Sequence, residues 1–164
     1  MSVIKAASTH PLYERLCQIL DSERVSDSPV VMASYSRDAC HLVAERPGIV
    51  VMPESVEEVQ AIVRLCAETK TPLVPAGGRN GICGACLPRV KDAVLLDMVK
   101  MDRVVEIDEQ VMTVTVEAGI RWAELIHRLD EKGYKLGFRG PYGGNVGTVG
   151  GSVSINSIGY AASK

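Results

Sequence analysis

Glycines that could form an anion cradle are gathered in two short segments of this chain. Residues 1–76 contain one glycine, whereas PAGGRNGICGAC (75–86) and GFRGPYGGNVGTVGG (137–151), here the first and second glycine loops, contain most of the fifteen. Glycine costs conformational entropy, so a cluster indicates positive-φ turns or close approach of the backbone to a ligand. Peptide N–H groups in consecutive turns can bind a pyrophosphate. We therefore expect both loops to hold one large phosphate-bearing cofactor, the alternative for each being an ordinary surface turn.

The spacing of these glycines excludes two well-defined nucleotide-binding motifs. Neither loop contains G-x-G-x-x-G, the fingerprint of dinucleotide-binding βαβ units, or the P-loop pattern G-x-x-x-x-G-K-[ST]. Both loops instead contain G-x-x-G-x-x-G, which is a weak pattern by itself. Its context is more specific, because the first loop follows a predicted strand and the second runs through Thr-Val-Gly-Gly into another.

Composition and charge exclude several classes of protein. Hydrophobic residues make up 46% of the 164 residues and charged residues 23%, which is typical of a globular domain with a core. A net charge of −2 gives no electrostatic reason to bind nucleic acid. The N-terminus lacks the apolar core of a signal peptide, and five cysteines, an odd number, indicate reduced thiols. We expect a cytoplasmic protein that reaches a membrane only through partner subunits.

Hydrophobic periodicity predicts mixed α and β structure. Helices are expected at 9–21, with Thr9 as a cap, from Ser55, where SVEE forms a capping box, and at 121–132. The segment 30–40 is expected to be extended or a loop. Strands are expected at 49–52, 71–76, 93–98, 103–107, 111–119 and 152–156. Residues 46–85 then form a βαβ unit whose first glycine loop lies at the carboxyl end of a strand, where ligands bind in such sheets.

Other residues that could carry chemistry favour structural roles. Cys83 and Cys86 form C-x-x-C, but a zinc or iron–sulfur site needs about four ligands and no second pair lies at useful spacing, so no metal is expected. We expect Trp122 and three cysteines to be core residues, three histidines to be exposed or satisfied, and four acids to be solvated or at strand edges. These sets are Cys17, Cys40 and Cys66; His10, His41 and His127; and Asp97, Asp102, Glu106 and Asp108.

Several runs of sequence resemble one known family. They are RPGIVVMPESVEEVQAIVRLCAETKTPLVPAGGRNG, AVLLDMVKMDRVVEID, VEAG and GTVGGSVSINSIG, preceded by the lead-in Tyr35-Ser36-Arg37-Asp38. Residues 46–164 resemble the FAD-binding domain of the vanillyl-alcohol oxidase / p-cresol methylhydroxylase superfamily, in its glycolate oxidase and D-lactate dehydrogenase branch. The resemblance implies an α+β, PCMH-type FAD-binding fold of two small α+β subdomains, incomplete at its C-terminus.

The resemblance also implies a division of the chain. Residues 1–45 are expected to be a helical lead-in, and residues 46–164 the FAD-binding domain, with subdomains at 46–105 and 106–164. The family's substrate-binding domain is absent from this sequence, and with it the residues that bind an acid substrate and take its proton. No catalytic residue is therefore assigned here.

Cofactor-binding roles carry over by position from the same resemblance. The pyrophosphate loop corresponds to Pro75, Ala76, Gly77, Gly78, Arg79, Asn80 and Gly81. The segment along the flavin corresponds to Gly147, Thr148, Gly150 and Gly151, followed by Ser154, Asn156 and Ser157. Arg79 stands where relatives usually have a third glycine, and Ile158 also replaces a glycine. Asn80 replaces the histidine that some relatives use for covalent attachment, so the FAD is expected to be non-covalent.

The function implied is oxidation of a 2-hydroxy acid such as glycolate or D-lactate by an FAD-linked oxidase or dehydrogenase, of which this chain is the FAD-binding part. Alone, the chain is expected to be inactive and to hold FAD weakly. Two alternatives remain. One is a non-catalytic subunit or remnant that pairs with a separate C-terminal subunit or with itself, and the other is a relative of the FAD-dependent cell-wall precursor reductase.

Overall fold

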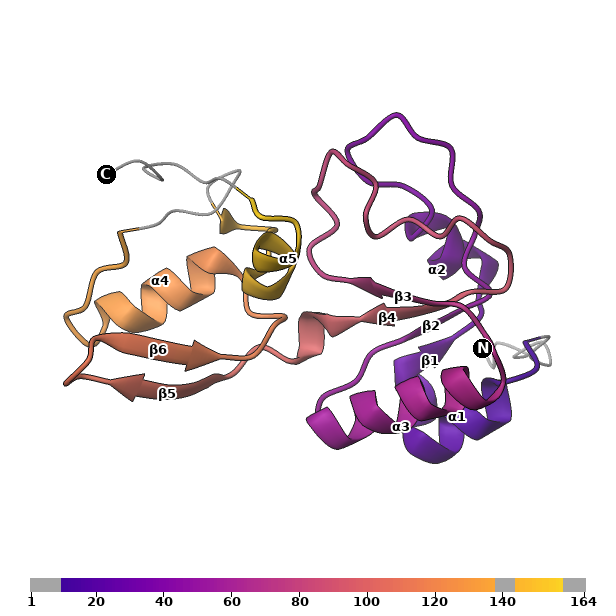
Figure 1. Cartoon of the computed structure of the whole chain (residues 1–164), viewed down its shortest axis with the longest axis horizontal. Coiled ribbons are helices and arrows are strands. Elements are labelled where there is room, and N and C mark those ends of the chain that lie inside the picture. The colour runs from indigo at the N-terminus through magenta and orange to yellow at the C-terminus, as the bar shows by residue number, and fades with distance from the viewer. Residues whose placement is uncertain (1–9, 138–143, 158–164) are drawn as a thin grey trace, which may run out of the picture.

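Two β-sheets organise the computed structural model, which describes residues 10–137 and 144–157 (Figure 1). The first sheet has the order β1-β2-β4-β3, in which β1 pairs antiparallel with β2 and the other pairs are parallel. The second sheet is the antiparallel hairpin of β5 and β6. The strands are β1 (Val25–Ser26), β2 (Ile49–Val51), β3 (Leu73–Ala76), β4 (Val94–Asp97), β5 (Val104–Asp108) and β6 (Thr113–Val116).

Helices cover both faces of the first sheet. In Figure 1, α1 and α3 lie below that sheet and α2 lies above it. The first sheet with α1, α2 and α3 forms the first unit. The hairpin with α4 and α5 packed on it forms the second, and the short helix η2 joins the two. The helices are α1 (Tyr13–Ile19), η1 (Ser22–Arg24), α2 (Pro29–Ser34), α3 (Val56–Glu68), η2 (Met98–Lys100), α4 (Trp122–Asp130) and α5 (Val149–Ser154). None of the helices within the described ranges has the length and apolarity required to span a membrane.

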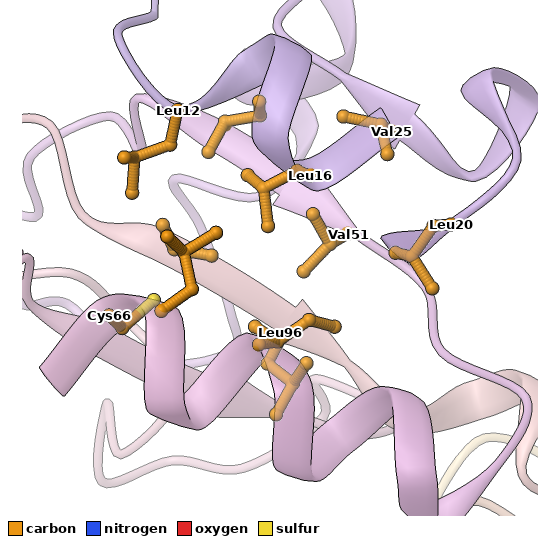
Figure 2. Packing of buried hydrophobic residues seen from close by; sticks show 11 residues of the cluster. Leu12, Leu16, Leu20, Val25, Val51, Cys66 and Leu96 are labelled. Carbon is orange, nitrogen blue, oxygen red and sulfur yellow. The ribbon is translucent and has the colours of Figure 1, made fainter. Parts of the chain in front are cut away.

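The core of the first unit explains why its central strands are apolar without interruption. Ile49 and Val51 of β2 pack with α1 and α3, and Figure 2 shows their layer of side chains between the helices and the sheet. The intervening Val50 belongs to the opposite layer, with Tyr35 beside α2. Strands buried on both faces read as continuous apolar runs rather than alternating ones. Truncation of the fully buried Leu16 to Ala would cost about 2–5 kcal/mol.

The start of α3 forms half of the predicted capping box. The Ser55 hydroxyl accepts a hydrogen bond from the Glu58 amide at 3.2 Å, as a helix N-cap should. The Glu58 carboxylate accepts from the amide of Glu54 rather than that of Ser55, and both of its oxygens accept from the Arg24 guanidinium at 2.7 Å. The Arg24 hydrogen bond is the main cause of a lowered Glu58 pKa. The ion pair therefore fastens the β1 edge to α3.

The second unit places its apolar side chains as the alternation predicts. Val114 and Val116 of β6 pack inward with Leu125 of α4, whereas the threonines of β6 are exposed. Trp122, predicted to be core, is buried and its indole N–H donates to the Ser152 hydroxyl at 2.8 Å. That bond links α4 to α5 and fixes where the second glycine loop enters α5.

Two elements differ from the sequence predictions. Residues 152–156 were expected to be a strand, but α5 covers 149–154, because Thr148 caps a helix whose inward residues, Val149 and Ser152, are three apart. The valine at 153 is 73% exposed. The segment 30–40 contains α2, which Pro29 begins at its first position. The cap of α1 is Leu12 rather than Thr9, which lies outside the described residues.

Candidate functional site

The first glycine loop leaves the carboxyl end of β3, as predicted. Ala76, the last residue of β3, is buried and pairs with Asp97, the last residue of β4, whereas Pro75 is exposed. The chain then turns through Gly77 and Gly78. Since β3 and β4 are parallel, their carboxyl ends meet at one edge of the sheet, where ligands bind in such folds.

The second glycine loop is bound to the segment before α4. The amides of Val149 and Gly150 donate to the carbonyls of Ile120 and Ala118 at 2.9 and 2.8 Å. A Cβ on Gly150 would lie 2.6 Å from the Cβ of Ala118, so glycine is required there by packing. The amide of Gly151 donates to the Thr148 hydroxyl at 3.3 Å. The first amides of α5 are therefore already satisfied by protein groups.

The two loops contact each other. A Cβ on Gly78 would overlap the backbone of Val146, and a Cβ on Gly77 would overlap the Thr148 hydroxyl. Loops that are about seventy residues apart in sequence therefore lie in direct contact, and the absence of side chains at 77 and 78 is what lets them meet. Two of the glycines read from sequence as ligand contacts thus have a reason within the protein itself.

Two other residues of the first loop, Gly81 and Asn80, have features that contacts among the described residues do not explain. Within the part of the chain that the structure describes, Gly81 has no heavy atom within 4 Å of an added Cβ and its φ is not positive, so these residues would accept a side chain there. The Nδ2 atom of Asn80 is buried and has no hydrogen-bond partner in the structure. An unpaired buried donor costs about 1–3 kcal/mol. A ligand acceptor at this point would supply the missing partner.

Arg79 is directed toward α2. Its φ is 52°, in the left-handed region, and its guanidinium lies 3.9 Å from the centre of the Tyr35 ring. It also donates to the carbonyl of Ser34 at 2.7 Å. The Tyr35 hydroxyl donates to Asp97 at 2.5 Å, and burial followed by this hydrogen bond raises the pKa of Tyr35. Tyr35 is therefore a neutral donor at physiological pH.

Asp97 corrects a prediction made from sequence. It was expected to be a solvated or strand-edge acid, but it is 2% exposed and accepts from Tyr35 and from the Val99 amide. A buried carboxylate needs such partners. Sequence gave a weak signal for it, because Asp97 ends an otherwise apolar buried strand beside the first glycine loop.

The three predicted residues after Gly151 lie on α5 and its end rather than on a strand. The Ser154 hydroxyl donates to the carbonyl of Gly150 at 2.7 Å and is therefore engaged within the helix. Asn156 is exposed with a φ of 50°, and the Ser157 amide donates to the carbonyl of Ser152. Ile158 lies outside the described residues.

Cys40, Cys86 and His10 contact neighbouring groups of the protein itself. The prediction for Cys40 was wrong, since it lies on a loop rather than in the core; Asp38, by a side-chain hydrogen bond, raises its pKa. Cys86 approaches the same carboxylate at 3.9 Å. His10 is buried and its Nδ1 accepts from the Leu12 amide. Within residues 10–137 and 144–157, no group of three or more His, Cys, Asp or Glu side chains could hold a metal ion.

Two hollows lie beside α2, and no described residue of either glycine loop lines them. One of about 510 Å³ is bordered by His10, Met32 and Lys91, and one of about 540 Å³ by Arg37 and Leu42. Their lining side chains show neither a buried unpaired group nor a glycine cluster. We therefore place the candidate site at the first glycine loop, where Nδ2 of Asn80 is unpaired and Gly78 contacts the second loop.

Comparison with known proteins identifies the family and several relatives of this chain. The family model described as "FAD binding domain" matches residues 47–164. The chain is 31% identical over 156 residues to "Glycolate oxidase subunit GlcD" of Bacillus subtilis and 32% identical over 119 residues to "D-lactate dehydrogenase" of Anaerostipes hadrus. These alignments cover 95% and 73% of this chain, but 33% and 24% of the relatives, so the chain spans about a third or less of their length.

Solved structures show the same architecture. A structure of alkyldihydroxyacetonephosphate synthase superposes with a TM-score of 0.81 at 26% identity, covering 91% of this chain and 32% of the other. Substrate-bound p-cresol methylhydroxylase superposes with a TM-score of 0.79 at 23% identity, covering 89% and 29%. The fold is thus the mixed α+β, PCMH-type FAD-binding fold, as the sequence predicted.

The chain belongs to the FAD-binding domain family, and its cofactor is FAD. The residues present fit that cofactor. The unpaired Nδ2 of Asn80 is a donor suited to a phosphate or carbonyl oxygen, and the space beside Gly81 admits close approach of a ligand to the backbone. Both features follow directly after Gly77 and Gly78, the residues of the first loop that contact the second.

Proposed function

We propose that this chain is the FAD-binding portion of an FAD-linked oxidase or dehydrogenase that acts on a 2-hydroxy acid such as glycolate or D-lactate. The observation that carries the proposal is the buried, unpaired Nδ2 of Asn80 in the first glycine loop, which contacts the second loop through Gly77 and Gly78. When bound, FAD supplies the two-electron chemistry that protein side chains lack. The contribution of this chain is to bind and orient it.

Each loop has a distinct task in this proposal. The backbone from Gly77 to Gly81 approaches the diphosphate, and Asn80 donates from its amide to a phosphate oxygen. Among the described residues, the amides of 77–81 donate no backbone hydrogen bond, so they are available to an anion. The second loop, from Gly147 to Gly151, forms the adjoining wall along the flavin. Its own amides at 149–151 bond within the protein and so keep this wall in place.

The choice of substrate class follows the relatives. Curated relatives include glycolate oxidase, D-lactate dehydrogenase and the "D-2-hydroxyglutarate dehydrogenase" of Stutzerimonas stutzeri, which is 29% identical over 150 residues. All three names refer to 2-hydroxy acids. Fold likeness also extends to alkyldihydroxyacetonephosphate synthase, so the fold by itself does not select the substrate. These names favour the hydroxy-acid assignment over a cell-wall precursor reductase or a non-catalytic remnant.

We also propose that another subunit, or a second copy of this chain, covers the exposed apolar side chains around α5. Val146, Val153 and Ile155 are 46%, 73% and 43% exposed. Val149, at the start of α5, packs inward instead. Exposed apolar groups close together favour association. Light scattering over a dilution series tests this, and a monomer at every concentration contradicts it.

Titration of the chain with FAD, followed by quenching of flavin fluorescence, tests the proposed site. Asn80→Ala should weaken FAD binding about ten- to a hundredfold, because it removes a donor to a charged oxygen, worth about 1.5–3 kcal/mol. The control is Gln110→Ala, which removes an exposed carboxamide in the β5–β6 turn and should leave the affinity unchanged. Equal affinities for wild type and Asn80→Ala would place the cofactor elsewhere.

A further inference from the structure

Asp97 forms a fixed point at the carboxyl edge of the first sheet. It is the last residue of β4, buried, and paired in register with Ala76, the residue before Gly77. One of its oxygens accepts from the Val99 amide at 3.1 Å and the other from the Tyr35 hydroxyl at 2.5 Å. With both oxygens bonded, the carboxylate holds the Tyr35 ring in a set position relative to the strand ends.

Tyr35 in turn provides a platform for Arg79. Only 9% of Tyr35 is exposed, and the guanidinium carbon of Arg79 lies 3.9 Å from the centre of its ring. A guanidinium stacked on an aromatic face is held by cation–π attraction, and its planar fork can donate hydrogen bonds at the same time. Arg79 does so, because Nη1 donates to the carbonyl of Ser34 at 2.7 Å. Two contacts therefore fix this side chain.

The backbone at Arg79 needs such fixing. Its φ of 52° is in the left-handed region, which costs energy for a residue with a Cβ and persists only where the surroundings enforce it. The stacking on Tyr35 and the hydrogen bond to Ser34 are the side-chain contacts available to hold this conformation. The next residue is Asn80, whose buried Nδ2 has no partner. The conformation of Arg79 therefore determines where the amide of Asn80 lies.

We propose that Arg79, Tyr35 and Asp97 form a clamp that presets the first glycine loop for FAD, with Arg79 as a positioning residue and Asn80 as the residue that contacts the cofactor. This inference rests on the proposed function. In this arrangement the guanidinium remains on Tyr35 and Ser34, and its role is to hold the backbone rather than to neutralise phosphate. A loop held in its binding conformation loses less entropy when a ligand binds.

Three variants of the whole chain test the clamp. Arg79→Gly accepts φ > 0 without a side chain, and so removes the clamp without adding strain. Arg79→Lys keeps the positive charge but lacks the planar fork that stacks and donates together. The control is Arg89→Gly. Like Arg79, Arg89 lies between β3 and β4, and its guanidinium donates to the carbonyl of Val43 at 3.2 Å.

Two measurements are made on each variant: hydrogen exchange of the amides of 77–82 without FAD, and the affinity for FAD. We expect Arg79→Gly and Arg79→Lys each to speed exchange in this segment and to weaken FAD binding about tenfold, or about 1.4 kcal/mol. Thermal unfolding should be nearly unchanged, since these residues do not form the core. Arg89→Gly should match wild type in exchange of 77–82 and in affinity.

Each other outcome has a definite meaning. Unchanged exchange in Arg79→Gly overturns the clamp. Wild-type affinity in Arg79→Lys also overturns it, since charge on a phosphate would then be the contribution of Arg79. If the wild-type chain binds no FAD, the proposed function is contradicted. Faster exchange at 77–82 in the Arg79 variants would then still support the clamp as a device that orders the loop.

Discussion

Gly78 and Val146 belong to different glycine loops, yet a Cβ on Gly78 would overlap the carbonyl oxygen of Val146. The same holds for Gly77 and the Thr148 hydroxyl. These glycines are needed so that the loops can touch, whether or not a ligand is bound. The two glycine loops therefore pack directly on each other.

Replacement of Gly78 by Ala should separate the loops. Because the obstructing atom is backbone, it cannot move as a flexible side chain would, and overpacking of this kind costs about 1–3 kcal/mol. We expect Gly78→Ala to lower the free energy of unfolding in urea by about that amount and to weaken FAD binding as well. Wild-type stability in this variant would show that the loops do not pack as described.

Replacement of Gly81 by Ala should weaken FAD binding without lowering the free energy of unfolding. Among the described residues, no atom lies within 4 Å of the added Cβ and φ is compatible with Ala, so stability should be unchanged or rise by about 0.4–1 kcal/mol. FAD affinity should nevertheless fall, because the methyl group occupies the space that we assign to the cofactor. An alanine variant that binds FAD as tightly as wild type would remove Gly81 from the site.

The Arg24–Glu58 pair should make stability depend on pH in a defined direction. Arg24 lowers the pKa of Glu58 below its ordinary value of 4.5, so the pair contributes stability above pH 4.5 and loses it as the pH falls through the lower, folded-state pKa. At about pH 7, Glu58→Gln should be less stable than wild type by about 1–2 kcal/mol. Urea unfolding at about pH 7 and about pH 3 measures the difference, which should shrink at the acid end.

The neighbouring Glu57 offers a control for that experiment. It is exposed on the same turn of α3, and Glu57→Gln should change stability by less than about 0.5 kcal/mol at either pH. A constant deficit for Glu58→Gln at both pH values would mean that packing, rather than charge, accounts for its effect.

Ser152 should stabilise the junction of α4 and α5 through Trp122, the one tryptophan of the chain. Ser152→Ala removes the acceptor of the indole N–H, so stability should fall by about 1 kcal/mol. The emission of Trp122 should shift in the folded state, because its polar surroundings change. Ser154→Ala, on the exposed side of α5, is the matched variant and should leave the emission at its wild-type wavelength.

The strands could be predicted because their signals are local. Ile49–Val51 and Val94–Asp97 are short apolar runs between turn residues, and the valines of Thr113–Val116 alternate with threonines. The helix at 149–154 could not be predicted in this way. Val153 and Ile155 alternate as in a strand, but burial there follows Val149 and Ser152 instead, and the N-cap of Thr148 decides the conformation.

Part of the candidate site also depends on tertiary contacts that no local pattern reveals. The sequence located both glycine loops at element ends, and the structure shows that they meet. The sequence did not indicate that Tyr35 links Asp97 to Arg79, because Tyr35 lies 62 positions from Asp97 and 44 from Arg79. Pro29 was the signal for α2 that could have placed Tyr35 near the site.

Hydrogen exchange of the chain with and without FAD tests the central claim most directly, namely that both glycine loops hold one cofactor. We predict that saturating FAD slows exchange at the amides of 77–82 in the first loop and at 147–151 in the second, at the same FAD concentration. The residues that line the two hollows beside α2 should show no change. Protection confined to one loop, or to those hollows, would contradict the account.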